Sequence, residues 1–393
     1  MQKTECDYLV IGAGIIGSSI ARALAYKTQS RIVVLEKEAS FGCHASGRNS
    51  GVIHSGINQK PGSLKGEMCV KGSRLLRDYC RKKNVPMQEC GTLVIARNER
   101  ESAALQELWE MGRQCGVEDL RLLTGEELRV REPLALGREA LLSPTGAVVD
   151  SKKLLEAVIE DARSSGVAFH LCAAALNLDG AEVTAGETCF KARHVINCAG
   201  LYADKIAHQA GVGLHYRIVP FRGEYVEVRG CAVNSMIYQP PDLRFPFLSI
   251  HLTRETDGRV LAGPTATLAF GREDYDKQYS FLNAKELWLD PAFWKLLLWP
   301  DFFQMARRNA HMSCSRHAFF REISRLVRPL SPEQIAPAKS GIRAQMVDQS
   351  GNLVNDLLVE KGPHSTHVLN AVSPGMTAAL AFADYVLDNY IPH

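Results

Sequence analysis

Three glycines near the amino terminus have the spacing of a phosphate-binding turn. They occur in the segment GAGIIG (12–17), directly after the short apolar run 7–11 and before a segment with helical periodicity. In such a turn Gly12 permits the tight bend, Gly14 lets the backbone approach a pyrophosphate, and Gly17 lets the helix pack on the strand. The first turn of the helix then offers free N–H groups and the positive end of its dipole to the phosphates.

An acidic residue, Glu36, follows the next apolar run, 31–35, and completes a strand–helix–strand unit. At this position a carboxylate can accept hydrogen bonds from ribose hydroxyls. The same carboxylate would repel a 2′-phosphate, which argues against NADP. The glycine turn, the helix, the second strand and the terminal acid together predict a dinucleotide site.

The segments that follow indicate which dinucleotide binds. After Glu36 comes a loop of small and polar residues, ASGRNSGVIHSG (45–56), which can pass close to a large planar ring. Further short segments rich in small residues occur at 197–200, 341–343 and 373–377. Contacts spread over the whole chain favour FAD, whose ring must reach a second domain. Because 373–377 contains no cysteine, we expect FAD to bind non-covalently. The expected cofactor-binding residues are Gly12, Gly14, Ile16, Gly17, Glu36, Lys37, Ser46, Arg48, Asn49, Ser50, Gly51, Val52, Ala199, Gly200, Gly341, Pro374, Gly375, Met376 and Thr377.

Longer segments carry a family resemblance: SGRNSGVIHSGI (46–57), PGSLKGEMCVKG (61–72), VPFRGEY (219–225), FLSIHLTRETDGRVLAGPTATLAF (247–270), SGIRAQMVDQSGNLVNDLLVE (340–360) and NAVSPGMTAALAFADYV (370–386). In them the chain resembles the D-amino-acid-oxidase-like FAD-dependent oxidoreductases, and within these the enzymes that oxidise L-2-hydroxyglutarate. The resemblance covers essentially the full length. It implies a Rossmann-like FAD-binding domain of the glutathione-reductase type with an inserted antiparallel-sheet substrate domain. The implied activity is oxidation of an L-2-hydroxy acid, here L-2-hydroxyglutarate to 2-oxoglutarate, by hydride transfer to flavin N5.

Two histidines, His54 and His251, are candidates for the base that removes the hydroxyl proton. A neutral imidazole, with an unperturbed pKa near 6.5, suits this role around neutral pH. His54 follows the loop expected to contact the flavin, and His251 lies in a segment of alternating strand character. The family resemblance singles out these two among twelve histidines, and it does not rank them.

Cationic side chains are expected to hold the carboxylates of a hydroxy acid. Arg343, in the sequence Gly-Ile-Arg, can bind one carboxylate through two parallel hydrogen bonds. A second carboxylate needs further donors, for which Lys65, Thr253 and Arg254 are candidates. Arg222 could equally serve in packing between domains. No metal site is expected, because the eleven cysteines include no C-x-x-C pair.

The carboxy-terminal segment 373–389 predicts a helix that opens with Ser-Pro, with Pro374 in its first helical position. If the amino-terminal end of this helix points at N1 and C2=O of the flavin, it stabilises the negative charge that reduction places there.

Hydrophobic patterns elsewhere supply the elements that must position these residues. The segment 151–165 predicts a helix capped by Ser151, 284–328 predicts helices, and 194–199 predicts a buried strand. The segments 218–228 and 247–261 alternate as strands of an antiparallel sheet do. The predicted fold is therefore α/β with two interleaved domains. The FAD-binding domain is expected to comprise 1–85, 141–215 and 335–393, and the substrate domain 86–140 and 216–334.

Composition and charge narrow the classes of function. The chain has 393 residues, of which 46% are hydrophobic and 23% charged, as in an ordinary soluble protein of two domains. Its net charge of +3 is too small to suggest nucleic acid as a partner. The apolar settings of most cysteines fit a reducing compartment. The apolar run 8–26 contains Arg22 and the three spaced glycines, so we expect neither a signal peptide nor a membrane span, and a cytoplasmic location.

An aromatic and basic segment, 288–308, contains Trp288, Trp294 and Trp299, and Arg307 and Arg308 near its end. An exposed helix of this kind could lie on the inner face of a membrane and bring the reduced flavin toward a quinone. The alternative is an aromatic cap packed on the substrate domain.

The residues leave other functions open. The same fold could serve an amino-acid or sarcosine-type amine oxidase, or a glycerol-3-phosphate dehydrogenase whose anion site takes a phosphate. Outside catalysis, the alternative is an FAD-dependent binding or assembly protein. The sequence does not indicate whether electrons leave to a quinone, a carrier or oxygen.

Overall fold

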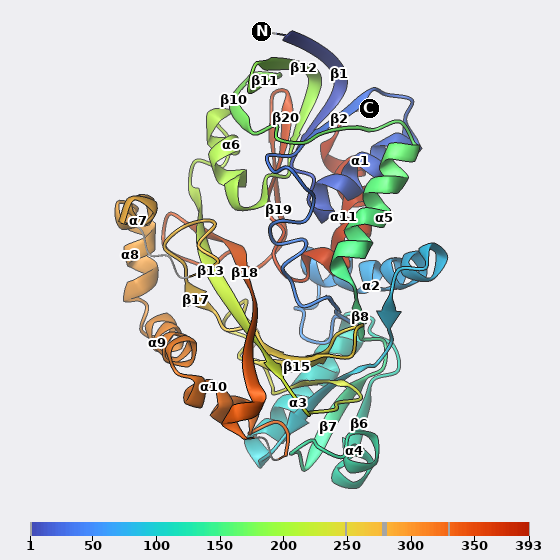
Figure 1. The fold of residues 1–393 in the computed structure, drawn as a ribbon, viewed down its shortest axis with the longest axis vertical. Helices are drawn as coiled ribbons and strands as arrows, with labels where there is room; N and C mark the ends of the chain where they lie inside the picture. The colour runs from blue at the N-terminus through green and yellow to red at the C-terminus, as the bar shows by residue number, and fades with distance from the viewer. Residues whose placement is uncertain (1, 248–249, 277–280, 329–330, 393) are drawn as a thin grey trace.

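The computed structural model describes residues 2–247, 250–276, 281–328 and 331–392, and these residues form two large sheets and one small one (Figure 1). In the first large sheet, β1 lies at the centre and pairs in parallel with β2 on one side and β12 on the other. Its strands are β1 (Gln2–Ile11), β2 (Ile32–Leu35), β9 (Ala168–His170), β10 (Ala175–Asp179), β11 (Glu182–Ala185), β12 (Thr188–Asn197), β19 (Leu358–Gly362) and β20 (Ser365–Asn370).

The predicted strand–helix–strand unit is confirmed as β1, α1 (Ile15–Lys27) and β2. Its apolar residues are buried because helices cover the sheet: α1 packs against α5 (Ser151–Ser164) and α11 (Gly375–Tyr390), and α11 packs against α2 (Leu64–Lys83) (Figure 1). Chain segments from both ends of the sequence therefore share one core.

Two of the predicted helix starts differ by one residue from the structure. The cap of α5 is Asp150, whose carboxylate accepts hydrogen bonds from the N–H groups of Lys152 and Lys153. A carboxylate at this position competes well with a hydroxyl for the free N–H groups. Pro374 precedes α11 as its N-cap residue and is not its first helical residue.

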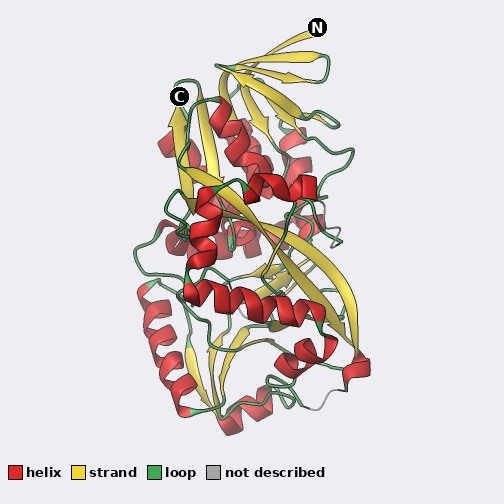
Figure 2. Ribbon diagram, turned by 90° about the vertical axis from the view of Figure 1, so that its left-hand side faces the viewer, coloured by secondary structure: helices red, strands yellow, loops and turns green. Residues whose placement is uncertain are grey.

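The second large sheet is built on two long antiparallel strands, β13 and β18, which run through the middle of the molecule (Figures 1 and 2). β18 falls within the range that the sequence assigns to the FAD domain, and it pairs along most of its length with β13 in this sheet. The strands of the sheet are β5 (Thr92–Ala96), β6 (Arg121–Thr124), β7 (Glu139–Ser143), β13 (Tyr216–Val228), β14 (Met236–Tyr238), β15 (His251–Arg254), β16 (Val260–Gly263), β17 (Thr267–Leu268) and β18 (Ile335–Asp348).

A row of helices follows one edge of the molecule beside the second sheet (Figure 1). It confirms the helices predicted for 284–328 and comprises α7 (Phe281–Trp288), α8 (Pro291–Leu298), α9 (Pro300–Cys314) and α10 (Arg316–Ile323). The remaining elements are the small sheet of β3 (Val52–Ile53), β4 (Met87–Gln88) and β8 (Ala147–Val149), the helices α3 (Glu99–Gln114), α4 (Gly125–Arg131) and α6 (Ala203–Gln209), and the short 3₁₀ turns η1 (Gly200–Tyr202) and η2 (Pro332–Gln334). Among the described residues, every helix is too short or too polar to cross a membrane.

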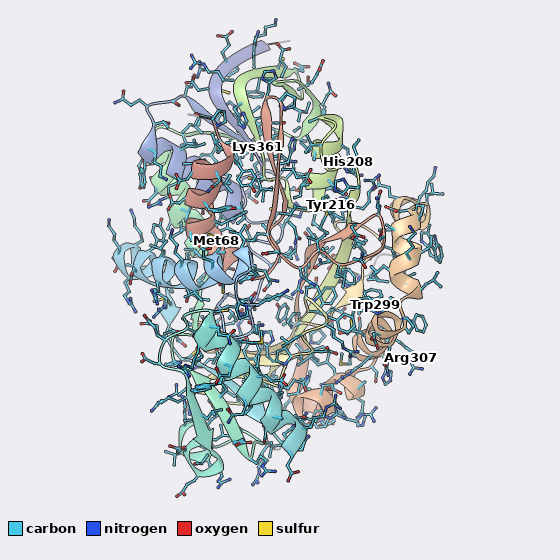
Figure 3. All side chains as sticks on the ribbon, turned by 180° about the vertical axis from the view of Figure 1, so that it is seen from behind. Met68, His208, Tyr216, Trp299, Arg307 and Lys361 are labelled. Atoms are coloured by element: carbon cyan, nitrogen blue, oxygen red, sulfur yellow. The ribbon has the colours of Figure 1, made fainter. Side chains whose placement is uncertain are left out.

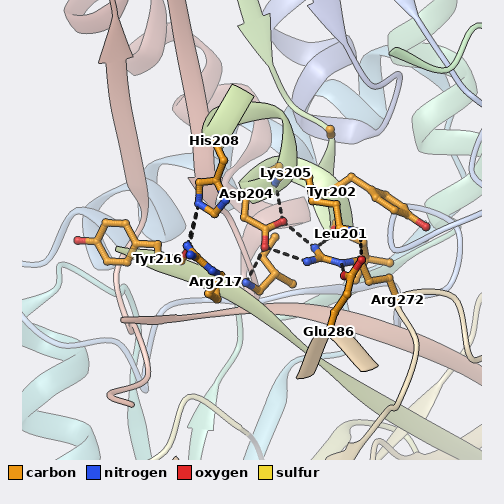
Figure 4. A network of polar contacts seen from close by, with 12 residues as sticks. Leu201, Tyr202, Asp204, Lys205, His208, Tyr216, Arg217, Arg272 and Glu286 are labelled. Atoms are coloured by element: carbon orange, nitrogen blue, oxygen red, sulfur yellow. Dashed lines mark hydrogen bonds and ion pairs between the residues drawn. The ribbon is translucent and has the colours of Figure 1, made fainter. Parts of the chain in front are cut away.

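A buried ion pair ties the two large sheets together (Figure 4). Asp204 of α6 accepts hydrogen bonds from Arg272 at 2.6 and 2.9 Å, and Arg272 follows β17 in the chain. The same carboxylate accepts the N–H of Ile218 in β13 at 3.0 Å. Because Asp204 is only 1% exposed, this contact is shielded from water. It links α6 to β13 and to the segment that follows β17.

Candidate active site

A cavity of about 700 Å³ is lined by residues of both large sheets, a volume typical of cofactor sites. Segments from the beginning, middle and end of the chain meet on its walls. Gly17 and Gly51 lie behind the wall. The expected cofactor-binding residues that line the cavity are Gly12, Gly14, Ile16, Glu36, Lys37, Ser46, Arg48, Asn49, Ser50, Val52, Ala199, Gly200, Gly341, Pro374, Gly375, Met376 and Thr377.

The glycine turn has room for glycine alone. Gly12 has a φ of +101°, and a Cβ there would lie 2.5 Å from the carbonyl oxygen of Cys198. A Cβ on Gly17 would lie 2.0 Å from the carbonyl oxygen of Gly12. The tight turn therefore brings the amino-terminal end of α1 to the cavity wall, as a pyrophosphate requires.

Hydrogen bonds to Glu36 hold the acidic residue beside this turn. One carboxylate oxygen accepts the N–H of Ala13 at 3.1 Å, and the other accepts the N–H of Glu38 at 3.1 Å. Nearby, the Ser46 hydroxyl accepts the N–H of Ile15 at 2.9 Å. Two backbone N–H groups of the turn therefore donate to side-chain oxygens of Glu36 and Ser46.

The loop after Glu36 is shaped by its own polar side chains. The Arg48 Nε donates to the carbonyl of Cys43 at 2.7 Å, and the Asn49 amide donates to the carbonyl of Ser46 at 2.8 Å. A Cβ on Gly341 would lie 2.4 Å from the Arg48 carbonyl oxygen, so β18 approaches this loop backbone to backbone. Arg48 and Asn49 therefore fix the loop, and the backbone of the loop forms much of the wall.

Residues after β17 close over the same loop. The Tyr275 hydroxyl lies 2.6 Å from Nδ1 of His44, and the Arg48 guanidinium stacks 4.1 Å above the Tyr275 ring. Glu273 pairs with Lys37 at 2.7 Å and accepts the hydroxyl proton of Tyr202 at 2.7 Å. The second sheet thus contributes one rim of the cavity.

Thr377 fixes the start of α11 against His54. Its hydroxyl oxygen accepts the N–H of His54 at 3.0 Å and donates to the carbonyl of Val52 at 3.3 Å. α2 crosses α11 at this point, where a Cβ on Gly72 would lie 2.4 Å from the Thr377 carbonyl oxygen. The amino-terminal end of α11 and the His54 loop therefore lie side by side on the cavity wall.

At the other end of the cavity, His54, His251 and Arg343 share the wall. One Arg343 nitrogen donates to the carbonyl of Pro246 at 2.9 Å, and the guanidinium lies 5.1 Å from the centre of the Phe247 ring. His251 stacks on Tyr238, with the ring centres 4.1 Å apart and the planes inclined by 11°. Packing thus orients each of the three polar side chains.

Burial and positive charge shape the electrostatics of this end. Burial, and then the nearby His251, Arg343 and Lys65, lower the pKa of His54 to about 3. Burial, and then Arg343, lower the pKa of Lys65, and burial lowers the pKa of Arg343. His54 is thus neutral at physiological pH, and the cationic groups around it favour a bound anion.

The other substrate-binding residues suggested by the sequence lie off the cavity wall. Lys65 is in the first turn of α2, and its N–H donates to Asp356 at 2.7 Å. It lies close enough to His54 and Arg343 to shift the pKa of His54. Thr253 is 3% exposed but does not line the cavity, and the Arg254 side chain is exposed.

Arg222 packs between elements of the second sheet. It is 1% exposed and pairs with Asp274 at 3.3 Å and with Glu224 at 3.7 Å. Of the two roles that the sequence left open, this environment supports packing.

Sequence reasoning missed the aromatic walls. Tyr225, Phe221 and Phe247 line the cavity, and burial raises the pKa of Tyr225 to about 12. Tyr225 is the last residue of the segment VPFRGEY, which carries the family resemblance, so the sequence could have indicated it as a site residue. Alternating aromatic residues in a strand are, however, also typical of core packing.

Comparison with known proteins gives a family and close relatives. The family described as FAD dependent oxidoreductase matches residues 7–388. The mitochondrial L-2-hydroxyglutarate dehydrogenase of Homo sapiens is 34% identical over 97% of this chain and 88% of that protein. The L-2-hydroxyglutarate dehydrogenase of Escherichia coli K12 is 33% identical over 97% of this chain and 92% of that protein. The resemblance stated from the sequence is therefore confirmed.

Solved structures share the fold over nearly the whole chain. L-alpha-glycerophosphate oxidase from Mycoplasma pneumoniae, solved with FAD bound, has a TM-score of 0.80 at 23% identity and covers 99% of this chain and 96% of its own. Glycine oxidase from Geobacillus kaustophilus has a TM-score of 0.74 at 18% identity and covers 98% and 94%. The predicted α/β fold, a Rossmann-like FAD-binding part with a second sheet, is confirmed.

Proposed function

This chain belongs to the FAD dependent oxidoreductase family, and we propose that it oxidises L-2-hydroxyglutarate to 2-oxoglutarate. FAD is its cofactor. The observation that carries the proposal is the cavity itself, which has a dinucleotide-binding turn at one end and His54, His251 and Arg343 at the other. The names of the curated relatives support the choice of substrate.

The chemistry at the far end of the cavity suits a substrate with two carboxylates. Arg343 is half-buried and one of its nitrogens donates to the Pro246 carbonyl, so its remaining N–H groups can bind one carboxylate in parallel hydrogen bonds. Lys65 adds positive charge close by. We propose that these two cations together favour a dianionic hydroxy acid over a neutral or singly charged one.

FAD fits the residues at the near end of the cavity. Gly12 and Gly14 would admit the pyrophosphate, Glu36 would accept the ribose hydroxyls, and the wall residues of 45–52, 199–200 and 373–377 would surround the rest. When bound, FAD supplies the acceptor for the hydride that leaves C2 of the substrate. The wall segment 373–377 contains no cysteine, which supports non-covalent binding.

We propose His54 as the base that takes the hydroxyl proton. Its pKa of about 3 keeps the imidazole neutral in the free protein, and a bound dianion would raise that pKa by offsetting the charges of Arg343 and Lys65. Thr377 holds the His54 backbone beside the start of α11. His251, stacked on Tyr238, would then orient the substrate.

The amino-terminal end of α11 supports electron transfer in this arrangement. Gly375, Met376 and Thr377 lie on the cavity wall in the first turn of a 16-residue helix. Their N–H groups and the helix dipole would stabilise negative charge that develops nearby.

A panel of substrates tests the proposed function. The FAD-loaded protein is given a redox dye and either L-2-hydroxyglutarate, its D enantiomer, an amino acid, sarcosine or glycerol 3-phosphate, and dye reduction and product are measured. We expect fast dye reduction with L-2-hydroxyglutarate and formation of 2-oxoglutarate. Faster turnover of an amine or of glycerol 3-phosphate would replace this proposal by one of the other two enzymatic functions.

We also propose that the segment 288–308 rests on the inner face of a membrane, where the enzyme passes electrons to a quinone. A carrier protein or oxygen is the alternative acceptor. Large apolar side chains are exposed along this segment, and two exposed arginines follow them: Arg307, which is labelled in Figure 3, and Arg308. This pattern suits an anionic lipid surface. The exposed apolar residues are Trp288, Leu289, Trp294, Leu298 and Phe303.

Flotation with detergent-free anionic liposomes tests this contact. We expect the wild-type protein to float with the vesicles and the Leu298→Glu variant, altered at a side chain 79% exposed, to float much less. The matched control is Val130→Glu, at a side chain 80% exposed on α4, which should float like the wild type. Wild-type protein that stays at the bottom of the gradient would end the membrane proposal.

A further inference from the structure

A second, smaller cavity lies behind His54. Its volume is about 20 Å³, and His54 is on its wall as well as on the wall of the large cavity. His54 therefore lies between the two spaces. The small cavity is also lined by residues of 55–58, by β5 and α3, and by Tyr238, Gln239 and Pro241.

Two residues on this wall carry buried hydroxyl groups that make no hydrogen bond within the described part of the chain. They are the Ser55 Oγ and the Tyr238 Oη, in residues only 5% and 7% exposed. A buried hydroxyl that makes no hydrogen bond is costly. A space of this size holds one water molecule when polar groups line it, and one water could bond to both hydroxyls.

The small cavity also leads toward the surface. Asn58, Gln239 and Pro241 on its wall are partly exposed, whereas Ser55 and Tyr238 are buried. The wall of the small cavity thus combines His54 and two buried hydroxyl-bearing residues with residues that reach the solvent.

We propose that the small cavity holds one water molecule, which links His54 to the hydroxyls of Tyr238 and Ser55 and carries the substrate's hydroxyl proton out of the site. The inference rests on the proposed function, because the oxidation of the substrate's hydroxyl group releases the proton that the water carries. Bound substrate and cofactor would occupy the large cavity on one side of His54, and the small cavity would then offer the proton an exit on another side.

The relay moves one proton from the substrate, through His54 and the water, to bulk solvent. The O–H bond of the substrate breaks and an N–H bond forms on one ring nitrogen of His54. The N–H on the opposite ring nitrogen breaks and its proton joins the water, which passes one proton on toward Gln239 and bulk solvent. One proton leaves for each substrate oxidised, and the electron pair of the C2–H bond leaves as hydride to the oxidant that the enzyme already uses.

Tyr238 is a positioning residue in this scheme. It touches His251 through its ring and the small cavity through its hydroxyl. Tyr238→Phe keeps the stacked ring and removes only the hydroxyl. Because that hydroxyl makes no hydrogen bond with any residue that the structure describes, the variant is expected to fold and bind FAD like the wild type.

The first test does not depend on activity. A high-resolution crystal structure of the FAD-bound protein should show one ordered water within about 2.7–3.0 Å of both Tyr238 Oη and Ser55 Oγ. The corresponding structure of Tyr238→Phe should show this water lost or displaced. A small cavity without ordered water in the wild type would overturn the inference.

The second test measures the proton path. Anaerobic stopped-flow measures the rate of flavin reduction by saturating L-2-hydroxyglutarate in mixtures of H₂O and D₂O. We expect a bowed dependence on the D₂O fraction for the wild type, because several protons move together. For Tyr238→Phe and Ser55→Ala we expect rates about 10- to 100-fold lower, unchanged substrate affinity and a linear dependence.

The matched control is Tyr79→Phe, which removes a buried hydroxyl of α2 that donates to Asp161, in a residue that lines neither cavity. It should keep the wild-type rate and the bowed dependence. If Tyr238→Phe behaves like Tyr79→Phe, the relay is wrong while the proposed function stands. If the wild-type flavin is not reduced, the proposed function fails, and the relay fails with it because no substrate proton is delivered.

Discussion

His54 is the residue on which the proposed chemistry depends most. Thr377 holds its backbone N–H, positively charged groups lie near it, and it lines both the large and the small cavity. A neutral imidazole in such a place binds a proton poorly until an anion arrives. Substrate binding and readiness to accept a proton are therefore linked through the same charges.

Replacing Arg343 tests the carboxylate site. In Arg343→Met the substrate loses its charged hydrogen bonds, and we expect kcat/KM to fall about 10²-fold or more, mainly through KM. The control is Arg254→Met, at an exposed side chain off the cavity wall, which should leave kcat/KM unchanged. Equal effects of the two replacements would contradict the assignment.

At the residue scale the sequence indicated His54, His251 and Arg343 through family segments, and all three line one cavity. It also suggested Thr253 and Arg254, which do not line the cavity. Arg254 lies on the face of β15 opposite to His251, because strand residues alternate in direction, whereas Thr253 shares the face of His251 but lies about 7 Å further along the strand. Tyr238 carries no signal in the sequence, since its role arises from a stacked contact with a residue of another strand.

Among the elements, the βαβ unit was the most predictable, because its glycine spacing has a local physical cause. Helix starts were less so: Asp150 and Ser151 are both good caps, and the choice between them is decided by packing. The pairing of β18 with β13 joins residues more than a hundred positions apart, which no local pattern encodes.

The close packing of α1 on β1 gives a prediction for cofactor binding. In Gly17→Ala the new methyl group would meet the Gly12 carbonyl oxygen at 2.0 Å, so the turn must open. Overpacking of this kind costs about 1–3 kcal/mol, or roughly 10- to 100-fold in the Kd of FAD. The measurement is the quenching of FAD fluorescence on titration.

The control for this prediction is Ser19→Ala in the same helix, where the buried hydroxyl has no partner and FAD affinity should not change. Gly17→Ala protein that binds FAD as tightly as the wild type would show that the turn tolerates a side chain.

Buried histidines between β12 and β20 make stability depend on pH. Burial, and then His194, lower the pKa of His367 to about 4, and its Nδ1 faces the Asn197 amide at 3.1 Å. The unfolded chain, with a pKa near 6.5, binds this proton at higher pH. Stability from this group is therefore complete above pH 6.5 and is lost as pH falls toward 4.

We expect the Tm of the wild type to decline between pH 6.5 and 4.5, and the decline to be shallower by a few degrees in His367→Gln. The exposed His215 provides the control: His215→Gln should keep the wild-type slope. A His367→Gln slope equal to that of the wild type would assign the acid sensitivity to other groups.

For the molecule as a whole, we propose that the two large sheets mark two domains, with the substrate domain inserted into the FAD-binding domain. The cavity lies where segments of both meet, so its geometry depends on how the sheets are held together. Composition and periodicity indicated two interleaved domains. Which residues of the two sheets come together on the cavity wall is decided by tertiary packing, which the sequence patterns do not encode.

The Asp204–Arg272 pair tests that dependence (Figure 4). Asp204→Ala removes the closer of the two carboxylates that pair with the Arg272 guanidinium and leaves Glu286 at 3.6 Å, so it should lower the free energy of unfolding by about 3 kcal/mol. The control is Asp301→Ala, which breaks the exposed pair with Arg244 and should cost about 0–1 kcal/mol. Urea midpoints measure both, and similar values for the two variants would contradict a structural role for the buried pair.

An anaerobic titration of the FAD-loaded protein with L-2-hydroxyglutarate, followed by flavin absorbance, tests the central claim most directly. We predict that one equivalent of substrate bleaches the flavin and yields one equivalent of 2-oxoglutarate. Absorbance that stays unchanged with L-2-hydroxyglutarate, while an amine or glycerol 3-phosphate bleaches it, would contradict the claim.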